Sequence, residues 1–448
     1  MSKKTWTTTV MSVGVAATLG MMASPIMVNA AATKPVTITI AFDSGAFSTQ
    51  EVQYFEKLHP GIRINLVTYN SGALPAEFAS GSAPDIIETT GSSLPSDVEK
   101  GLALNIQPYI NKTKSVFNPK NFNPVVDQYR WNGKVQGQGP LYGLPKDWSP
   151  DFDIWVNKKV FKEAGVPLPS AIKPMTWNQV FADAKKITLF TGKGKLVRYG
   201  LDYYADGQAQ PEYQLLSFQA QEQGVSLWSK DFSQAQFNNP KVMKILTQWV
   251  TAVKENIGPN SVNNDKNFFG SLFTSDKLGM MISGYWFSGY LRAAAPKTLN
   301  NYYMIPAPIY SAKYRMDPPA SATGAYIWTG SKHKAQAWTA FTYFFGQKPV
   351  IDRAESGWGL PIFKNKMALV PQKTAWDKSI LKVAKGDLKY ADKLIRFNPY
   401  VDATSVNTVM TNFLTPVYYG KSTLQNAVQQ IDGELNSLIQ AGMSTAGN

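Results

Sequence analysis

The stretch Val36–Phe42 (VTITIAF) is an alternating or fully buried strand that runs directly into the turn Asp43-Ser44-Gly45. Two further strands are predicted at residues 62–67 (IRINLV) and 84–87 (PDII). A predicted helix over residues 48–59 separates the first two strands, and a short helix precedes the third. Strands that alternate with helices predict a parallel sheet built from β-α-β units.

The loops that follow these three strands are candidates for a binding edge. In open parallel sheets, ligands sit beyond the carboxyl ends of the strands. The side chains there are small and carry hydroxyl, amide or carboxylate groups, which suit a neutral polyhydroxylated ligand better than a phosphate or a metal. The same residues are common in ordinary turns and helix caps, and the sequence leaves that alternative open. The candidates are Asp43, Ser44, Asn70, Ser71, Thr89, Thr90 and Ser92.

Length and composition limit the number of domains and the kinds of functional site that the chain can contain. A chain of 448 residues exceeds what one hydrophobic core usually supports, so two domains are expected. Cysteine is absent, and His59 and His333 are the only histidines. Disulfides, a cysteine nucleophile, thiolate metal sites and a histidine-rich metal site are therefore excluded. We expect no metal and no cofactor.

The first thirty residues predict a signal peptide. Lys3 and Lys4 form its charged start, residues 10–26 are mostly apolar or small, and Val28-Asn29-Ala30 supplies a cleavage motif. A membrane anchor is the alternative, but polar residues interrupt the apolar run and no positive charge follows it directly. The sequence thus predicts an exported protein that is periplasmic, extracellular or associated with the cell envelope, and not lipid-anchored through a cysteine.

The formal charge of +14 raises the question of a nucleic-acid partner. The lysines are spread along the chain, with only short pairs such as Lys158-Lys159 and Lys185-Lys186, and there is no basic arm. Together with export, this pattern argues against nucleic acid as a partner.

The second half of the chain is more helical. Thr176 is expected to cap one helix and Ser331 another, and a further helix is predicted over residues 242–253. A strand is expected at residues 278–282 and a terminal amphipathic helix at residues 424–439. No repeat or low-complexity linker separates two halves, so the chain is expected to cross between two lobes more than once.

Signatures of common enzymes are missing. Gly-x-x-x-x-Gly-Lys, Gly-x-Ser-x-Gly and His-Glu-x-x-His do not occur, and Gly137-Gln138-Gly139 lacks the rest of a dinucleotide-binding loop. A glycosidase needs only two carboxylates, so the 31 acidic residues leave that class open. Asp43, Asp147 and Glu212 are the acids that we place near a cleft.

Several separated motifs, taken in order, carry a resemblance to a known family. They are residues 55–62 (FEKLHPGI), 81–86 (GSAPDI), 142–161 (with YGLP and VNKKVF), 174–177 (PMTW) and 331–338 (SKHKAQAW). This set resembles the extracellular solute-binding proteins of ABC importers, in the group that includes the maltose-binding protein.

The resemblance implies an α/β, two-lobed periplasmic-binding-protein fold of type II, with parallel-type sheets flanked by helices and a ligand cleft between the lobes. The N-lobe would comprise residues 36–146 and 301–346, and the C-lobe residues 147–300 and 347–448. The protein would be a monomer without catalytic residues, and its partners would be a small-molecule ligand and the ABC permease subunits.

The resemblance also implies further ligand contacts. Asp147 and Trp148, next to Lys146, fall in the first crossing segment, and Tyr285-Trp286 and Trp358 match the aromatic platforms of the second lobe. An indole ring packs well on the apolar C–H face of a pyranose, which favours Trp286 and Trp358 because both lie beside glycines in loops. Trp177, Trp249 and Trp338 lie on predicted helix faces and are expected in the core. Further candidates are Glu212, Tyr213 and Gly324.

We therefore expect a protein that captures a neutral mono- or oligosaccharide and delivers it to a permease. Two alternatives remain: the same fold with a non-sugar ligand such as a polyamine or a peptide, and a secreted glycosidase. Few arginines are available, and none lies in the three N-lobe loops, so an anionic ligand is the least favoured.

Overall fold

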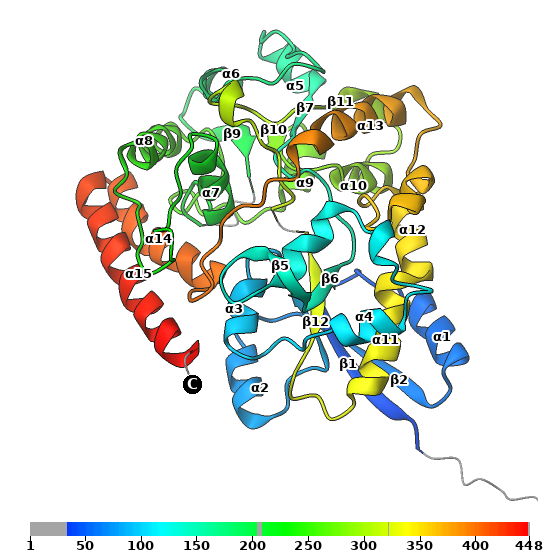
Figure 1. Cartoon of the computed structure of the whole chain (residues 1–448). Coiled ribbons are helices and arrows are strands. Elements are labelled where there is room, and N and C mark those ends of the chain that lie inside the picture. Colours follow the sequence, from blue (N-terminus) through cyan, green and yellow to red (C-terminus); the bar gives the residue numbers. More distant parts are fainter. Residues whose placement is uncertain (1–33, 204–207, 321, 447–448) are drawn as a thin grey trace, which may run out of the picture.

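The computed structural model describes residues 34–203, 208–320 and 322–446. It contains two lobes, one above the other in Figure 1, each built around a five-stranded sheet. The signal peptide predicted for residues 1–30 lies outside the described residues. Within the described ranges, no helix combines the length and the apolar character needed to cross a membrane.

The first lobe contains the sheet with strand order β2-β1-β3-β12-β6. β1 pairs in parallel with both β2 and β3, as expected from the sequence. Side chains alternate across β1, and Ile38 and Ile40 are fully buried. The strands are β1 (Val36–Phe42), β2 (Ile62–Thr68), β3 (Ile86–Thr89), β6 (Gly143–Pro145) and β12 (Gly324–Ile327).

Among the helices of this lobe, α1 begins with a side-chain cap, whereas α2, α3 and α4 begin with a proline in their first turn. Ser48 and Glu51 form a capping box for α1, in which Glu51 N donates to Ser48 Oγ at 3.2 Å and Ser48 N donates to Glu51 Oε2 at 2.6 Å. The helices are α1 (Thr49–Leu58), α2 (Leu74–Ser80), α3 (Leu94–Glu99), α4 (Gln107–Lys112) and α11 (Lys334–Gly346), and a small hairpin adds β4 (Arg130–Trp131) and β5 (Gln136–Leu141).

The second lobe contains the sheet with strand order β11-β7-β10-β9-β8. β10 pairs in parallel with β9 and antiparallel with β7. The strands are β7 (Ile154–Asn157), β8 (Leu189–Phe190), β9 (Leu196–Asp202), β10 (Leu278–Ile282) and β11 (Tyr302–Ile305). The helices are α5 (Lys158–Glu163), α6 (Trp177–Ile187), α7 (Tyr213–Gln221), α8 (Pro240–Lys254), α9 (Phe269–Thr274), α10 (Phe287–Ala294), α13 (Ala375–Asp387), α14 (Ala403–Tyr418) and α15 (Leu424–Ala446).

Three details differ from the sequence-based expectations. Both sheets are mixed, because β12 runs antiparallel to β3 and β7 runs antiparallel to both of its neighbours. β11 pairs with β7 over four residues, so residues 302–305 belong to the second sheet, and the chain returns to the first sheet only at β12. Ser331 does not cap α11, because the helix begins only at Lys334 after His333; Ser331 Oγ accepts from His333 N at 3.1 Å and donates to Asp85 at 2.6 Å.

The connections between the lobes lie side by side. Trp148 and Leu360 exchange two backbone hydrogen bonds, at 3.0 and 2.7 Å. Lys146 N donates to Thr323 O at 3.0 Å, and Asp151 N donates to Pro318 O at 3.3 Å. Residues 146–151 form the first crossing segment. They are hydrogen-bonded to the second crossing segment, at Pro318 and Thr323, and to the last one, at Leu360. In Figure 1, α12 (Lys348–Ser356) lies beside the boundary between the lobes.

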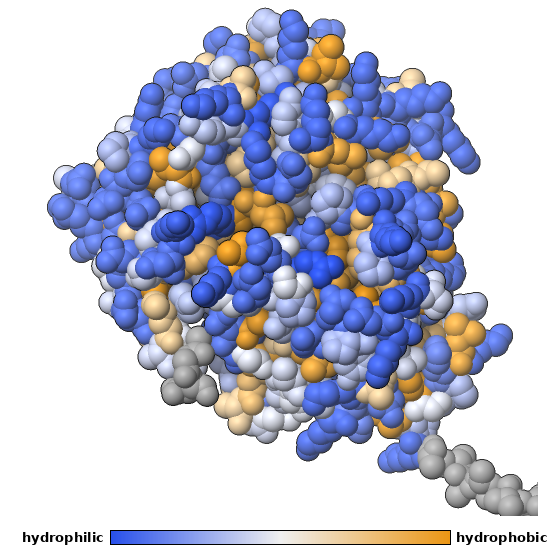
Figure 2. All heavy atoms as spheres, in the orientation of Figure 1, coloured by the Kyte–Doolittle hydropathy of each residue, from blue (hydrophilic) through white to orange (hydrophobic). Residues whose placement is uncertain are grey.

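The tryptophans expected in the core are buried. Trp177 is 0% exposed, Trp249 4% and Trp338 9%. Each indole N–H also has an acceptor, which a buried tryptophan needs. Trp177 donates to Glu222, Trp249 to Gln219 and Trp338 to Thr113. Hydrophilic residues cover most of the face of the molecule drawn in Figure 2.

Candidate functional site

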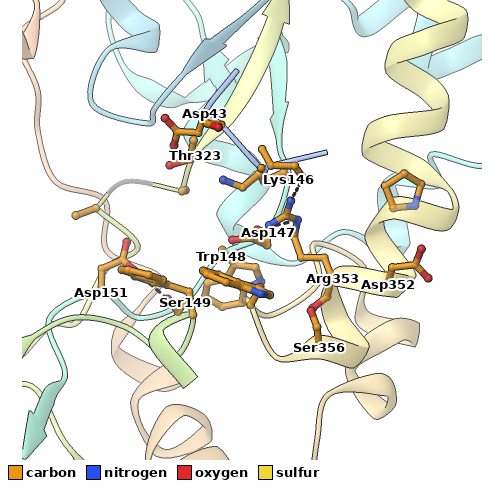
Figure 3. A pocket seen from close by; sticks show the side chains of 18 of the residues that line it. Asp43, Lys146, Asp147, Trp148, Ser149, Asp151, Thr323, Asp352, Arg353 and Ser356 are labelled. Atoms are coloured by element: carbon orange, nitrogen blue, oxygen red, sulfur yellow. Dashed lines mark hydrogen bonds and ion pairs between the residues drawn. The ribbon is translucent and has the colours of Figure 1, made fainter. Parts of the chain in front are cut away.

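A cavity of about 830 Å³ lies between the two lobes, against the crossing segments. Its walls come from the loop after β1 and the start of α1, the first and second crossing segments, the loop before α7, the residue that precedes α10, α12 and the last crossing segment. Figure 3 shows Asp43, Lys146 and Thr323 on one side of the cavity, and Ser149 and Asp151 on the other. The lining residues are Asp43, Ser44, Gly45, Ala46, Ser48, Glu51, Lys146, Asp147, Trp148, Ser149, Asp151, Tyr203, Gln208, Glu212, Gln214, Trp286, Ala320, Ala322, Thr323, Pro349, Asp352, Arg353, Ser356 and Trp358.

Two tryptophans from separate segments form an aromatic platform in this cavity. The rings of Trp286 and Trp358 are nearly parallel, with an angle of 11° between planes and 6.3 Å between centroids. Trp286 is held edge-on by Phe269 and Phe287. Trp358 is 36% exposed, which is unusual for so large an apolar ring. The pair presents apolar faces to whatever fills the cavity.

Glycines place Trp358 beside α10. Gly357 ends α12 in the left-handed conformation with φ of 76°, which glycine adopts at little cost. Its carbonyl accepts a hydrogen bond from Ser288 Oγ of α10 at 2.9 Å. A side chain on Gly289 would lie 2.9 Å from the Cα of Trp358, so a glycine is needed there for the close approach.

An ion pair joins α12 to the first crossing. Arg353 Nε lies 3.3 Å from Asp147 Oδ2, and both side chains are mostly buried, at 15% and 13% exposure. The Arg353 guanidinium also donates to the carbonyl of Ala46, in the loop after β1. Arg353 therefore connects three segments of the cavity wall, and its charge is locally compensated.

Lys146 is the second cation of the cavity. Its ammonium group lies 5.2 Å from the centroid of the Phe42 ring. Burial lowers the pKa of Lys146, while the nearby carboxylates of Asp147, Glu88 and Asp43 act in the opposite direction. The Lys146 side chain is therefore a hydrogen-bond donor that lies among carboxylate acceptors in the cavity.

Acidic groups outnumber basic ones in the lining. Six carboxylates face Lys146 and Arg353, although the whole chain has a formal charge of +14. Carboxylates accept hydrogen bonds from hydroxyl or ammonium groups and repel anions. The cavity is therefore suited to a neutral or cationic ligand with many donors. The six are Asp43, Glu51, Asp147, Asp151, Glu212 and Asp352.

Seven of the fifteen residues predicted as ligand contacts line the cavity, from five separate parts of the chain. These parts are the loop after β1, the first crossing, the turn before α7 and the two platform loops. The seven are Asp43, Ser44, Asp147, Trp148, Glu212, Trp286 and Trp358.

The predicted residues after β2 and β3 do not line it. β2 is the edge strand of its sheet, so Asn70 and Ser71 are exposed away from the cleft. Thr89 Oγ1 donates to Asp97 at 2.6 Å, and Thr90 and Ser92 are hydrogen-bonded to each other at 2.7 Å. Their polar groups are largely used in shaping the loop before α3.

Three other predicted residues have structural positions outside the cavity lining. Tyr213 is 1% exposed, and its hydroxyl accepts from the Trp228 indole at 3.1 Å. Tyr285, which precedes Trp286, is fully buried. Gly324 lies in β12, where a side chain would meet the carbonyl of Leu144 at 2.1 Å.

The helix α12 contributes residues that we did not predict from the sequence. Asp352, Arg353 and Ser356 line the cavity just before Trp358. The sequence could have indicated them only by their closeness to Trp358. They reach the cavity because α12 packs against the first crossing segment, where Arg353 pairs with Asp147. Glu51 and Gln214 were missed for the same reason: each lies on a helix whose facing surface the sequence does not specify.

Comparison with known proteins gives the class. Residues 42–350 match the family model described as bacterial extracellular solute-binding protein. The match covers more than half of the chain, and the protein belongs to this family.

Individual relatives are distant. A protein of Brucella abortus named as a binding protein is 22% identical over 446 residues, covering 94% of this chain and 98% of that protein. An ABC substrate-binding protein of Listeria monocytogenes, solved in complex with cycloalternan, superimposes with a TM-score of 0.72 at 22% identity, covering 91% of this chain and 99% of that one. The sugar-binding protein MalE of Xanthomonas citri gives a TM-score of 0.65 at 18% identity, with 91% and 98% coverage.

Proposed function

We propose that this protein is the exported substrate-binding component of an ABC importer and that it captures a sugar or an oligosaccharide between its lobes. The parallel pair Trp286 and Trp358 in an interlobe cavity is the observation that carries the proposal. The ligand would then pass to the permease subunits in the membrane.

The lining of the cavity supports a carbohydrate. A sugar ring has an apolar C–H face and a polar rim, so its site needs flat aromatic surfaces beside hydrogen-bonding groups. Here the indoles of Trp286 and Trp358 share the cavity with carboxylates, Lys146 and Arg353. The volume of about 830 Å³ lies in the upper part of the range of roughly 300–1,000 Å³ for small-molecule sites. This favours an oligosaccharide over a single ring.

Two of the structural relatives are consistent with this class of ligand. The Listeria protein was solved with cycloalternan, and the Xanthomonas protein is named as sugar-binding. In the loop of residues 89–92, Thr89 donates to Asp97 and Thr90 and Ser92 are hydrogen-bonded to each other, while Ser92 also accepts from Gln214 of the second lobe. The aromatic platform therefore has the larger part in ligand contact.

The remaining parts of the proposal follow from this role. The protein acts as a monomer, carries no catalytic activity and does not bind nucleic acid. A signal peptide at residues 1–30 directs export, and the mature chain works in the periplasm or at the cell surface. Without a cysteine, the chain cannot be anchored by a lipid on such a residue.

Intrinsic tryptophan fluorescence combined with calorimetry tests the proposal. We expect one member of a panel of mono- and oligosaccharides to shift or quench the emission and to bind with about one-to-one stoichiometry. No heat, no thermal shift and no spectral change with any saccharide of the panel would contradict it.

A cationic ligand is the second candidate, because six carboxylates line the cavity. A polyamine or an amino sugar would pair with them, and its affinity would fall as salt is added. Titrating spermidine and glucosamine beside neutral sugars separates the two candidates, since binding of a neutral sugar depends little on salt.

The glycosidase alternative has a direct test. The saccharide that binds is incubated with the protein, and the mixture is separated by chromatography. Recovery of unchanged saccharide supports a binding protein, whereas release of smaller sugars would support the enzyme.

A further inference from the structure

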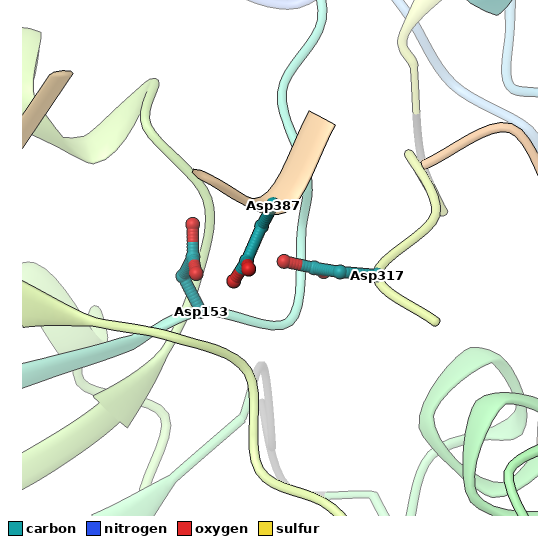
Figure 4. A group of neighbouring side chains, drawn as sticks. All are labelled: Asp153, Asp317 and Asp387. Carbon is teal, nitrogen blue, oxygen red and sulfur yellow. The ribbon is translucent and has the colours of Figure 1, made fainter. Parts of the chain in front are cut away.

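Three aspartates meet in the interior of the second lobe, outside the residues that line the cleft cavity. Asp153 precedes β7, Asp317 lies in the second crossing segment and Asp387 ends α13. Their exposed fractions are 0%, 0% and 2%. One carboxylate oxygen from each lies within 4.8 Å of the others. Figure 4 shows the side chains of Asp153 and Asp317 converging on Asp387 from two sides.

The hydrogen bonds around this cluster leave one set of oxygens without a partner. Asp317 Oδ1 accepts from Phe152 N at 2.9 Å, and Asp387 accepts from Arg315 at 2.7 Å and from Ala307 N at 3.3 Å. Both oxygens of Asp153 and Oδ2 of Asp317 are buried and accept no hydrogen bond. Buried carboxylate oxygens without donors are costly, so these atoms indicate a missing partner.

The hydroxyl of Ser283 is a further unpartnered group in this part of the second sheet. Ser283 is 0% exposed, and its Oγ has no hydrogen-bond partner. Ser283 N donates to Asp153 O at 2.8 Å, which continues the antiparallel register of β10 and β7 by one residue. Side chains directly opposite each other in such a pair lie on the same face of the sheet.

The charges also require a partner. When all three carboxylates are ionised they carry −3 and Arg315 carries +1, which leaves −2 at the cluster, and the buried Asp151 adds to this negative charge. Burial and mutual repulsion raise the pKa of Asp153 and of Asp317 well above their usual range. Two protons or one divalent cation would neutralise the excess. A proton shared between Asp153 and Asp387 would partner one oxygen of Asp153, whereas a cation can be coordinated by all of the unpartnered oxygens.

The chemistry of the donors selects the metal. All available ligands are oxygens, which suit hard cations. A cation here departs from our sequence-based expectation of no metal, which was argued only from the absence of cysteine and the scarcity of histidine. Mg²⁺ usually keeps several waters and needs octahedral geometry, whereas Ca²⁺ accepts irregular sets with bidentate carboxylates. Asp153 has both oxygens available for such a mode. We propose that Asp153, Asp317 and Asp387 bind a calcium ion.

The position of the ion gives it a structural role. Asp153 follows the first crossing segment and Asp317 lies in the second, where Asp151 N already donates to Pro318 O. A cation held by both, and by the end of α13, would fix the crossing segments relative to the second sheet. This role does not depend on which solute occupies the cleft.

The full chain without its signal peptide is freed of metal with EDTA and then given Ca²⁺ or Mg²⁺. We expect about one calcium per chain by elemental analysis after gel filtration, and a rise in Tm of about 5 °C or more with excess Ca²⁺. Mg²⁺ is expected to give a smaller rise. A larger rise with Mg²⁺, or no retained calcium and no change in Tm, would overturn the proposal.

Two variants identify the ligands. Asp153→Asn removes a charged ligand but keeps the shape, so it should lose the calcium-dependent rise in Tm while keeping a Tm in EDTA at least equal to that of the unmodified chain. Asp392→Asn, at an exposed aspartate nearby, should keep both the calcium and the rise. Calcium bound equally well by Asp153→Asn would place the ion elsewhere.

The pH dependence separates a cation from shared protons. Asp151, Arg315 and Lys389 are the other charged groups that act on the cluster. With EDTA, the raised pKa values mean that the stability from this cluster is lost as the pH rises above the usual carboxyl range. With calcium, that loss should disappear. Tm curves that fall equally in EDTA and in Ca²⁺ would mean that the aspartates share protons, and the calcium site would be rejected.

Discussion

Trp286 and Trp358 are large and apolar, yet both line an open cavity between the lobes. Trp286 is supported from behind by Phe269 and Phe287, whereas Trp358 remains 36% exposed. An exposed indole does not contribute to the stability of the fold as a buried one would. Its exposure is explained if a ligand covers the ring in the bound state.

Replacing Trp358 with alanine should therefore weaken ligand binding much more than folding. We expect at least a tenfold loss of affinity for the bound saccharide, because the sugar ring loses its apolar surface. Trp358→Phe should recover part of it. Calorimetry gives the affinity and thermal unfolding the stability. Tyr419→Ala, at an aromatic residue that is 54% exposed outside the cavity, is the control and should leave affinity unchanged.

Glu222 is a buried acid whose ionisation should be visible in the stability of the protein. It accepts the indole N–H of Trp177 at 3.0 Å, and desolvation raises the pKa of Glu222 from 4.5 to about 8. Because the folded pKa lies above the unfolded one, its stabilising contribution is complete below about pH 4.5 and is lost as the pH rises through about 8.

The variant Glu222→Gln should remove this dependence, since an amide accepts the same hydrogen bond without charge. It should match the unmodified protein near pH 5 and exceed its stability near pH 9 by a few kcal/mol, at about 1.4 kcal/mol for each unit of pKa shift. Urea unfolding at several pH values measures the difference. Parallel curves for the two proteins would show that Glu222 stays ionised throughout.

At the scale of elements, α12 is the part that completes the cavity. It presents Asp352 and Arg353 to the cleft and ends at Gly357, which aims the following tryptophan at α10. A Cβ on Gly357 would lie 2.3 Å from the Arg292 guanidinium. The helix, its cap and α10 therefore act together in placing one half of the platform.

Gly357→Ala should lower both stability and affinity. The left-handed φ of 76° costs about 1 kcal/mol for alanine, and the contact with Arg292 must then displace the loop. Gly420→Ala is a matched control, because Gly420 has φ of 69° after α14 but nothing within 4 Å of its Cβ position. Both variants should lose stability, and only Gly357→Ala should lose affinity. If the two variants bound the ligand with equal affinity, the cap of α12 would have no role in positioning the platform.

At the scale of the whole molecule, two contacts join the lobes away from the crossing segments. Gln214 Nε2 of α7 donates to Ser92 Oγ at 3.0 Å, and Lys100 lies 3.4 Å from Asp402 at the start of α14. Contacts of this kind are made only when the lobes are close together. They favour the closed arrangement and so contribute to ligand affinity.

Lys100→Gln should therefore weaken ligand binding modestly without touching the ligand. The pair is largely exposed, so we expect about a two- to fivefold loss at low ionic strength that disappears at high salt. Lys185→Gln is the control, because Lys185 pairs with Glu255 at 2.5 Å within the second lobe. A loss that is the same at all salt concentrations would mean that Lys100 acts by another route.

The sequence predicted the elements well where pattern and caps coincide. β1 and β10 have the bounds expected from their apolar runs, and Thr176 caps α6 as expected. It was less informative about the binding edge, because position in a sheet depends on strand order. Asn70 and Ser71 follow a strand as Asp43 does, yet β2 is at the edge and β1 is inside.

The sequence predicted the two-lobed class through a family resemblance, the first three strands, β10 and several helices, and it singled out the glycine-flanked Trp286 and Trp358 as candidate ligand contacts. Periodicity, capping and local glycine geometry are properties of neighbouring residues, so they can be read from the chain. The tertiary structure decided which side chains meet: Arg353 with Asp147, Trp358 with Trp286, and Asp153 with Asp317 and Asp387. Each of these groups joins segments far apart in the chain, and only the packing of the two lobes brings them together.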